Sequence, residues 1–215
     1  MNEVLLNRII DALLTGAIVT VEVSVGALAV ALVIGLTLAT IEHLTVNRAI
    51  SFLIRSYVES LRNVPSLTFL FLLYFGLAAV GVRLSSMTAA VIGLGLIGGA
   101  VVIDIFRAGF RSVPKGQNEA AAAIGLRPLA AFRLVILPQG LRLALPPLGN
   151  YAVGLVKDTS LVAAIAAPEV MFNARQIVNE TFATAWVYGA AAVLYLALTF
   201  VVGQAFILVE RRLEY

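Results

Sequence analysis

Long apolar stretches dominate this chain and limit it to a small set of folds. The first runs from about Leu13 to Ile41 with one charged residue, Glu22, inside it. As a helix it would be about 43 Å long, which exceeds the roughly 30 Å hydrocarbon core of a bilayer. Charged residues make up 13% of the chain, about half the fraction that is usual in a soluble domain. The sequence therefore predicts an all-α integral membrane protein.

Four further apolar segments follow the first. The stretch 42–62 is mixed in polarity, and we expect it to be an interfacial amphipathic segment that leads into the second span. Pro138, Pro146 and Pro147 are expected to break or kink the fourth span, and residues 168–184 to form a loop. The chain is thus predicted to be a single transmembrane domain over residues 1–215. Its five predicted membrane helices are 13–41, 50–80, 86–108, 134–165 and 185–210, with a cytoplasmic polar loop at 112–133.

The distribution of basic residues predicts the orientation, because cytoplasmic segments carry an excess of Lys and Arg. Alternate loops on one side hold nine such residues, and those on the other side hold three. The nine are Arg48, Arg55, Arg107, Arg111, Lys115, Arg127, Arg133, Arg211 and Arg212, and the three are Arg8, Arg83 and Arg175. This bias predicts an N-terminus outside and a C-terminus in the cytoplasm. It also explains the net charge of +3 without a nucleic-acid partner.

The residue content argues against several kinds of chemistry. The chain has no cysteine and a single histidine, His43, so we expect no disulfide and no metal site. The residues that intramembrane catalysis would require are not evident, and no catalytic residue is predicted. The run Gly93–Gly98 matches a dinucleotide-binding pattern, but it lies inside an apolar span without the strand that this motif needs. We interpret these glycines as small residues that let helices approach closely.

The polar loop at 112–133 carries the most informative pattern. Residues 118–124 read as a short alanine-rich helix with Glu119 near its N-terminus, where a negative charge suits the helix dipole. Gly125 fits a C-cap, and Pro128 can open a second short helix. A compact, smooth two-helix element is a suitable shape for docking in a groove of another protein. An ordinary amphipathic surface turn is the alternative.

This loop resembles the EAA motif of ABC importer permeases. The motif runs Glu-Ala-Ala, three residues, Gly, nine residues, Ile, one residue, Leu-Pro. Here Glu119-Ala120-Ala121 is followed at those spacings by Gly125, Val135 and Leu137-Pro138, with Val135 as the only departure. The resemblance implies that the loop is a coupling helix held in a cleft of a cytoplasmic ATPase. The coupling residues that it implies are Gly116, Gln117, Glu119, Ala120, Ala121 and Gly125.

The flanking segments resemble one branch, the polar amino-acid permeases of the histidine/glutamine/arginine/glutamate/opine type. Residues 57–65 are similar to its Y-x-E-x-x-R-G-x-P, with Asn63 in place of Gly, and residues 155–161 to its L-x-K-D-T-S-L. Where the branch often has Ala-Tyr-x-x-Glu, this chain has Asp104 in the last position. The implied partners are a cytoplasmic ABC ATPase dimer, a second permease copy or homologous permease, an extracytoplasmic solute-binding protein and an amino-acid solute.

Lys157 and Asp158 are the charges that most need an explanation. Each costs about 2.5–3.5 kcal/mol at a helix centre on insertion scales, so such residues usually face a cavity or a partner. A zwitterionic amino acid would suit a lining of both signs, whereas a structural or gating pair near a broken helix is the alternative. The candidate substrate-pathway residues are Asn63, Pro65, Asp104, Lys157, Asp158, Thr159 and Ser160. Asp104 and Arg107, three apart, are expected to form a local ion pair.

These features predict the permease subunit of an ATP-driven, binding-protein-dependent importer for a polar amino acid. Alternating access would be coupled to a separate ATPase that binds ATP and Mg²⁺, so this chain would bind no cofactor and would not itself be an enzyme. It would be a multi-pass protein of the bacterial cytoplasmic (inner) membrane. The alternative is an ATPase-independent membrane channel or scaffold subunit, which would explain the spans but not the spacing of the loop motif.

Overall fold

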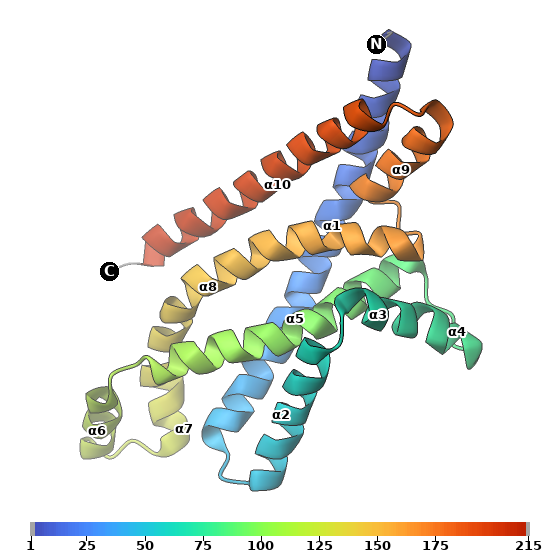
Figure 1. Cartoon of the computed structure of the whole chain (residues 1–215). Helices are drawn as coiled ribbons and strands as arrows, with labels where there is room; N and C mark the ends of the chain where they lie inside the picture. Colours follow the sequence, from blue (N-terminus) through green and yellow to red (C-terminus); the bar gives the residue numbers. More distant parts are fainter. Residues whose placement is uncertain (1–2, 214–215) are drawn as a thin grey trace.

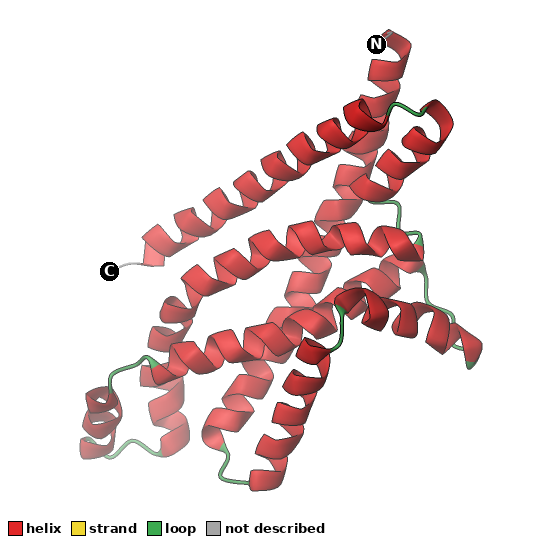
Figure 2. Cartoon of the chain, viewed as in Figure 1, coloured by secondary structure: helices red, strands yellow, loops and turns green. Residues whose placement is uncertain are grey.

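The computed structural model describes residues 3–213, which are almost entirely helical and contain no strand (Figure 2). Its α-helices are α1 Glu3–Leu44, α2 Arg48–Asn63, α3 Ser66–Phe71, α4 Leu77–Ala79, α5 Ser86–Arg111, α6 Lys115–Ala123, α7 Pro128–Ala131, α8 Leu137–Asp158, α9 Val170–Thr181 and α10 Thr184–Leu213. Short π-helical segments, Leu72–Gly76 and Phe132–Ile136, join α3 to α4 and α7 to α8. A 3-10 helix, Thr159–Ile165, continues α8.

Four stretches of the described chain are long and apolar enough to cross a membrane: α1, α5, residues 128–165 and α10. A fifth is obtained if α2 and the segment 66–79 are counted together, although these two are bent by 104°. The prediction of an all-helical membrane fold is confirmed. The expectation of one helix over 50–80 differs from the structure, because Pro65 disfavours helical backbone at the preceding residue and Val64 is extended, with φ −92° and ψ 130°.

Helices α1 and α5 form the most extensive interface of the fold, and they cross at the centre of the molecule (Figure 1). Small residues let the two backbones approach. A Cβ atom added at Gly95 would lie 2.7 Å from Val30, and one at Gly35 would lie 2.4 Å from Val102. The interpretation of the glycine run in the third predicted span as a close-packing surface is therefore confirmed.

Of the three prolines expected to break or kink the fourth span, Pro146 and Pro147 do not break it, because α8 continues through both. Pro138 lies in the first turn of α8, directly after the π-helical segment Phe132–Ile136. Pro146 and Pro147 lie on the exposed face of the helix. Buried Leu148 and Gly149 follow them directly, and Gly149 lies against α10, where an added Cβ would be 3.0 Å from Phe206. The α-helical hydrogen-bond pattern ends at Asp158, and the chain continues as the 3-10 helix.

The segment expected to be a loop at 168–184 contains helix α9. Its N-cap is Glu169, whose carboxylate accepts hydrogen bonds from the backbone of the first turn. Buried Val170, Ala174 and Ile177 pack in one apolar cluster with residues of α1 and α10. This helix was missed because the contacts that stabilise it come from distant parts of the sequence.

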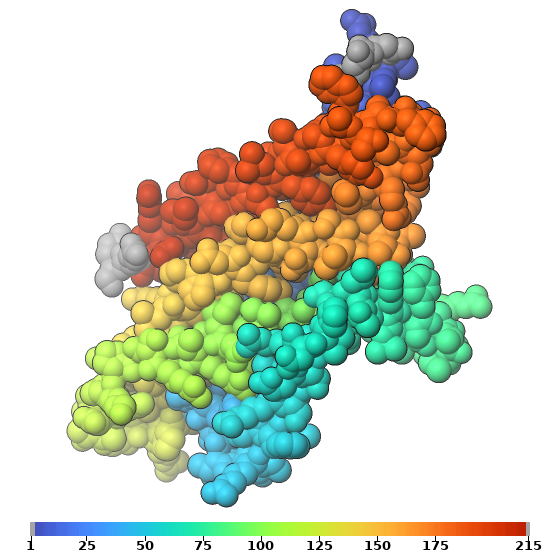
Figure 3. Space-filling model, in the orientation of Figure 1, coloured from blue at the N-terminus to red at the C-terminus, as the bar shows by residue number. Residues whose placement is uncertain are grey.

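The ends of the helices fall into two groups. The N-terminal end of α1, with α9 beside it, lies at the upper right of Figure 1, whereas α6, α7 and the C-terminal end of α10 lie toward the left. Figure 3 shows the α3–α4 arm projecting from the body at the right. The predicted coupling loop and the groove between α1 and α9 described below are therefore at different ends of the molecule (Figure 1).

Candidate functional site

The α6–α7 element, residues 115–131, has the two-helix form that its sequence predicts. Helix α6 starts at Lys115, three residues earlier than expected, and ends with Gly125 in the left-handed region at φ 78°. The amides of Gly125 and Leu126 bond to the carbonyls of Ala122 and Ala121 at 2.9 and 3.0 Å, as in a glycine-terminated helix. Pro128 opens α7. The predicted roles of Gly125 as C-cap and Pro128 as helix start are confirmed.

Most of this element is exposed. Within α6 only Ala121 is buried, and the side chains of Gln117 and Glu119 point away from the core. The carboxylate of Glu119 makes no hydrogen bond or ion pair within residues 3–213. Ile124 is 77% exposed and Leu129 64% exposed, so apolar side chains stand free on a polar loop. Such a surface is typical of a docking site for another protein.

An aromatic cluster joins this element to the membrane helices. Phe110 of α5 and Phe132, at the end of α7, meet edge to face with ring centroids 5.2 Å apart. His43 of α1 lies against both rings, at 5.7 and 5.0 Å. Gln139 of α8 donates a 3.3 Å hydrogen bond to Gln117 of α6. These contacts join the α6–α7 element to α1, α5 and α8.

A cluster of ion pairs ties together α1, α2 and α5 beside this element. Arg107 binds Glu42 and also Asp104, the latter at 2.8 Å. Arg62 binds the other oxygen of Asp104 at 2.5 Å. The predicted Asp104–Arg107 pair is confirmed, but it belongs to a larger set. The cluster borders a cavity of about 350 Å³ that is lined by Glu42, Arg55, Glu59, Asp104, Arg107, Ala108 and Arg111.

Replacing Arg107 by glutamine is expected to destabilise the protein, because Glu42 is only 11% exposed and would lose its best partner. We expect a loss of about 3 kcal/mol in unfolding free energy, measured by thermal unfolding in detergent. The double variant Glu42→Gln/Arg107→Gln should recover most of that loss. Arg55→Gln is the control, since Arg55 is 69% exposed and 3.6 Å from Glu42, and it should cost less than about 1 kcal/mol. Equal losses from both arginine substitutions would contradict this account.

Lys157 and Asp158 lie at the end of α8 and are exposed on the surface of the chain. Neither side chain forms a hydrogen bond or ion pair within the part of the chain that the structure describes. A Cβ added at Gly154, one turn earlier, would meet nothing within 4 Å. The two charges therefore stand beside open space on a helix that is apolar enough to cross a membrane.

The other predicted pathway residues are not equivalent in the structure. Asn63 and Pro65 are exposed at the bend between α2 and α3, and Ser160 is half-buried. Thr159, in contrast, is fully buried, and its hydroxyl donates to the carbonyl of Val156 at 2.7 Å. Asp104 has both carboxylate oxygens engaged by arginines. The structure thus exposes Lys157 and Asp158 but encloses Thr159, and it does not bring all seven residues to one surface.

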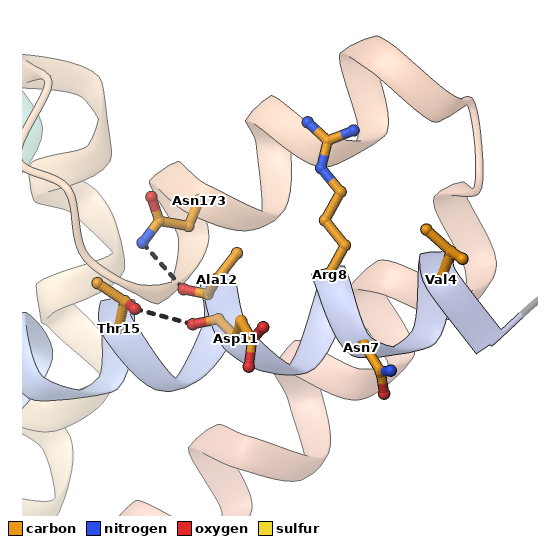
Figure 4. A pocket seen from close by; sticks show the side chains of 7 residues that line it. All are labelled: Val4, Asn7, Arg8, Asp11, Ala12, Thr15 and Asn173. Carbon is orange, nitrogen blue, oxygen red and sulfur yellow. Dashed lines mark hydrogen bonds between the residues drawn. The ribbon is translucent and has the colours of Figure 1, made fainter.

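An open polar groove of about 630 Å³ lies at the opposite end of the molecule, between α1 and α9 (Figure 4). Its lining residues are Val4, Asn7, Arg8, Asp11, Ala12, Thr15 and Asn173. The amide of Asn173 donates to the carbonyl of Ala12 at 3.1 Å, and Arg8 pairs with Glu180 of α9. Both contacts join the N-terminal part of α1 to α9.

Sequence reasoning missed several of these residues. Glu42 and Arg62 were not assigned to the ion cluster, because they lie 65 and 42 positions from the residues that they bind. Glu169 and Tyr195 were also overlooked, although the structure places them in contact in the interior. A carboxylate at the N-cap of an unrecognised helix was the one available signal for Glu169.

Comparisons of the sequence with known proteins agree on the protein family. A family model described as "binding-protein-dependent transport system inner membrane component" matches residues 31–215. The chain is 36% identical over 195 residues to a probable glutamine ABC transporter permease protein of Bacillus subtilis, covering 91% of this chain and 90% of that relative. It is 35% identical over 207 residues to the glutamine transport system permease protein of Escherichia coli K12, covering 95% and 94%.

Solved structures give the same result for the fold. The crystal structure of an amino acid ABC transporter with histidines superposes with a TM-score of 0.90 at 30% identity, covering 99% of each chain. An inward-facing MetNI methionine ABC transporter superposes with a TM-score of 0.83 over all of both chains. The latter is 19% identical, and this likeness concerns the fold alone.

Proposed function

This chain belongs to the family of binding-protein-dependent transport system inner membrane components, and from that premise we propose that it is the permease subunit of an ATP-driven importer for a polar amino acid. The relatives named above are amino-acid permeases. Their substrates include glutamine and, for another relative in Escherichia coli, histidine, lysine, arginine and ornithine. Their common chemistry is a zwitterion with a polar side chain, and this is the solute class that we assign.

The observation that carries this proposal is the exposed α6–α7 element, with its loop motif at the predicted spacing. The element presents an unpaired carboxylate, Glu119, and free apolar side chains at Ile124 and Leu129. We assign it to a cleft of a cytoplasmic ATPase, with Gly116, Gln117, Glu119, Ala120, Ala121 and Gly125 as the coupling residues. ATP and Mg²⁺ would be bound by that partner, and this chain would contribute no ATPase site.

Coupling then follows from the packing. Closure of the ATPases would move α6, and the contacts of Phe110 and Phe132 would carry that movement to α5 and α8. Because packed interfaces shift between discrete arrangements rather than deform continuously, a small displacement can change which side of the membrane the pathway faces. Alternating access of this kind requires a second permease, either another copy or a homologue, to complete the pore.

Lys157 and Asp158 are the residues that we assign to the solute pathway, together with Ser160, Asn63 and Pro65. Exposed charges without partners are costly against lipid, so their surface fits an aqueous cavity between subunits. The ammonium and carboxylate of an amino acid complement the two charges. We assign Asp104 and Thr159 supporting roles, because their polar groups are already engaged within the chain.

Neutralising either pathway charge should reduce transport without preventing assembly. We expect Lys157→Met and Asp158→Asn each to lower ATP-driven uptake by about tenfold, the effect of losing one charged hydrogen bond to a solute. Glu210→Gln, at the cytoplasmic end of α10, is the matched control and should retain uptake. Copurification of the ATPase provides the check on assembly. Full uptake by both pathway variants would remove these residues from the pathway.

The proposal also includes the orientation of the chain in the membrane and its extracytoplasmic partner. We place the protein in a bacterial cytoplasmic membrane, with the N-terminus outside and the C-terminus in the cytoplasm, as the distribution of basic residues predicts. The outer ends of the helices would then meet an extracytoplasmic solute-binding protein. The polar groove between α1 and α9 lies at that end (Figure 4).

Reconstituted transport provides the test. The permease would be placed in proteoliposomes with its copurifying subunits and the binding protein, and uptake of radiolabelled L-glutamine and L-arginine would be measured with and without ATP. ATP-dependent accumulation of either probe is the expected result. Movement of solute that needs neither ATP nor the ATPase would support the channel alternative, which the amino-acid permease relatives do not favour.

A further inference from the structure

Glu169 is a fully buried carboxylate outside the predicted pathway. It lies between the 3-10 helix that follows α8 and the start of α9, and none of its surface is exposed. Three groups donate to it: the amide of Met171 at 2.9 Å, the amide of Phe172 at 2.7 Å and the hydroxyl of Tyr195 at 2.5 Å. The first two are local contacts of a helix cap. The third is a contact with α10, and it joins residues that are 26 positions apart in the sequence.

The surroundings of this hydrogen bond include the pathway segment. The hydroxyl of Tyr195 also interacts with those of Thr159 and Thr20, and Thr20 of α1 accepts a 3.4 Å bond from the amide of Val170. Thr20 and Thr159 are both fully buried. One buried polar cluster therefore joins four elements: α1, the 3-10 helix, the start of α9 and α10.

The 3-10 helix needs such support from its surroundings. Its hydrogen-bond geometry is poorer than that of an α-helix, and it ends at Ala166 with φ 60°. This left-handed backbone costs a non-glycine residue free energy that other contacts must offset. Burial raises the pKa of Glu169, whereas hydrogen bonds from Tyr195, Met171 and Phe172 act in the opposite direction. The carboxylate is thus kept in an apolar interior by its partners.

We propose that Glu169 and Tyr195 are positioning residues for the solute pathway, and that their hydrogen bond fixes the segment 159–165 and, with it, the charges of Lys157 and Asp158. The pathway role rests on the proposed function. The fixing of the segment does not, and it can be measured separately.

The absence of cysteine from the sequence makes a clean labelling experiment possible. A single cysteine at Val162, fully buried on the 3-10 helix, reports on the segment. One at Val102, fully buried on α5 in a different apolar cluster, reports on the rest of the fold. Each reporter is combined with Tyr195→Phe and with Glu169→Gln. The matched controls are Tyr188→Phe, which alters another tyrosine of α10, and Glu180→Gln, which alters a carboxylate of α9. The rate of maleimide labelling is measured on the intact permease complex in detergent.

We expect Tyr195→Phe and Glu169→Gln to raise the labelling rate at Val162→Cys by about tenfold, because loss of this buried hydrogen bond favours local opening. Labelling at Val102→Cys should not change, and neither control should affect either reporter. The same two variants should lose most ATP-driven uptake while basal ATPase activity is retained. Unchanged labelling at Val162→Cys would overturn the proposal. A parallel rise at Val102→Cys would also overturn it, since the effect would then be general loss of stability.

The two levels of the proposal fail in different ways. If the wild-type complex transports no amino acid, the proposed function fails, while the labelling result for the segment stands. If labelling responds as expected but uptake by Tyr195→Phe and Glu169→Gln is normal, the segment is fixed by this bond but the pathway does not depend on it.

Discussion

Replacing Gly125 with aspartate is expected to abolish ATP-driven uptake and to leave the protein inserted in the membrane. Gly125 ends α6 at φ 78°, a conformation that costs other residues about 1–2 kcal/mol. An added Cβ would meet nothing within 4 Å, so the substitution disturbs no core packing. It would distort the end of α6 and place a charge on the surface assigned to the ATPase. We expect uptake to fall by more than about tenfold, corresponding to at least ~1.4 kcal/mol of lost coupling energy.

Gly81 provides a matched control for this prediction. It also has a positive φ, 92°, and an added Cβ there would meet nothing within 4 Å. It lies in the turn between α4 and α5, away from α6–α7. Gly81→Asp therefore introduces the same residue into a similar backbone conformation, and uptake should be largely retained. Equal loss in both variants would show that backbone strain alone explains the effect, and normal uptake by Gly125→Asp would contradict the coupling role.

Replacing Gly98 with valine is expected to prevent folding. A Cβ at this position would lie 1.8 Å from the hydroxyl oxygen of Tyr151 and 3.0 Å from the Cβ of Ala31. The ring of Tyr151 would have to leave its site against α5, and α1 would have to shift by a few tenths of an ångström at Ala31. Overpacking costs about 1–3 kcal/mol at ordinary sites, and this contact is closer than any real Cβ would tolerate. Because total stability is about 5–15 kcal/mol, we expect the yield of monodisperse protein in detergent to fall by roughly tenfold.

Gly203 of α10 is the control for the Gly98 prediction. A Cβ there would lie 3.7 Å from Val153, an ordinary van der Waals contact. Gly203→Val should therefore give a yield close to that of the wild type, measured by size-exclusion chromatography after detergent extraction. A normal yield for Gly98→Val would mean that α5 does not pack against α1 and α8 as the structure describes.

Features that depend on local sequence were predicted well. The α6–α7 element follows from alanine content, Gly125 and Pro128, all of which act within a few residues. The close-packing role of the glycine run also follows from its position inside an apolar segment, as Gly95 and Gly98 show. The membrane spans follow from length and hydropathy, which describe a segment without reference to its neighbours.

Features that depend on distant contacts were not predicted. The bond between Tyr195 and Glu169 joins residues 26 positions apart, and no local pattern indicates it. The same is true of Arg62, which takes up one oxygen of Asp104 and so removes that carboxylate from the group of free pathway charges. The continuity of α8 through Pro146 and Pro147 is likewise a tertiary effect, since packing on both sides of the prolines outweighs their local cost.

Copurification directly tests whether a separate ATPase docks on α6–α7 and drives this chain. The protein would be isolated in mild detergent from its native cells after gentle crosslinking, and the eluate analysed by mass spectrometry and for ATPase activity. A cytoplasmic ATPase is expected to be recovered with the wild type and to be largely lost with Gly125→Asp. If no ATPase is recovered with the crosslinked wild type, or if Gly125→Asp and the wild type recover it equally, docking through α6–α7 is contradicted.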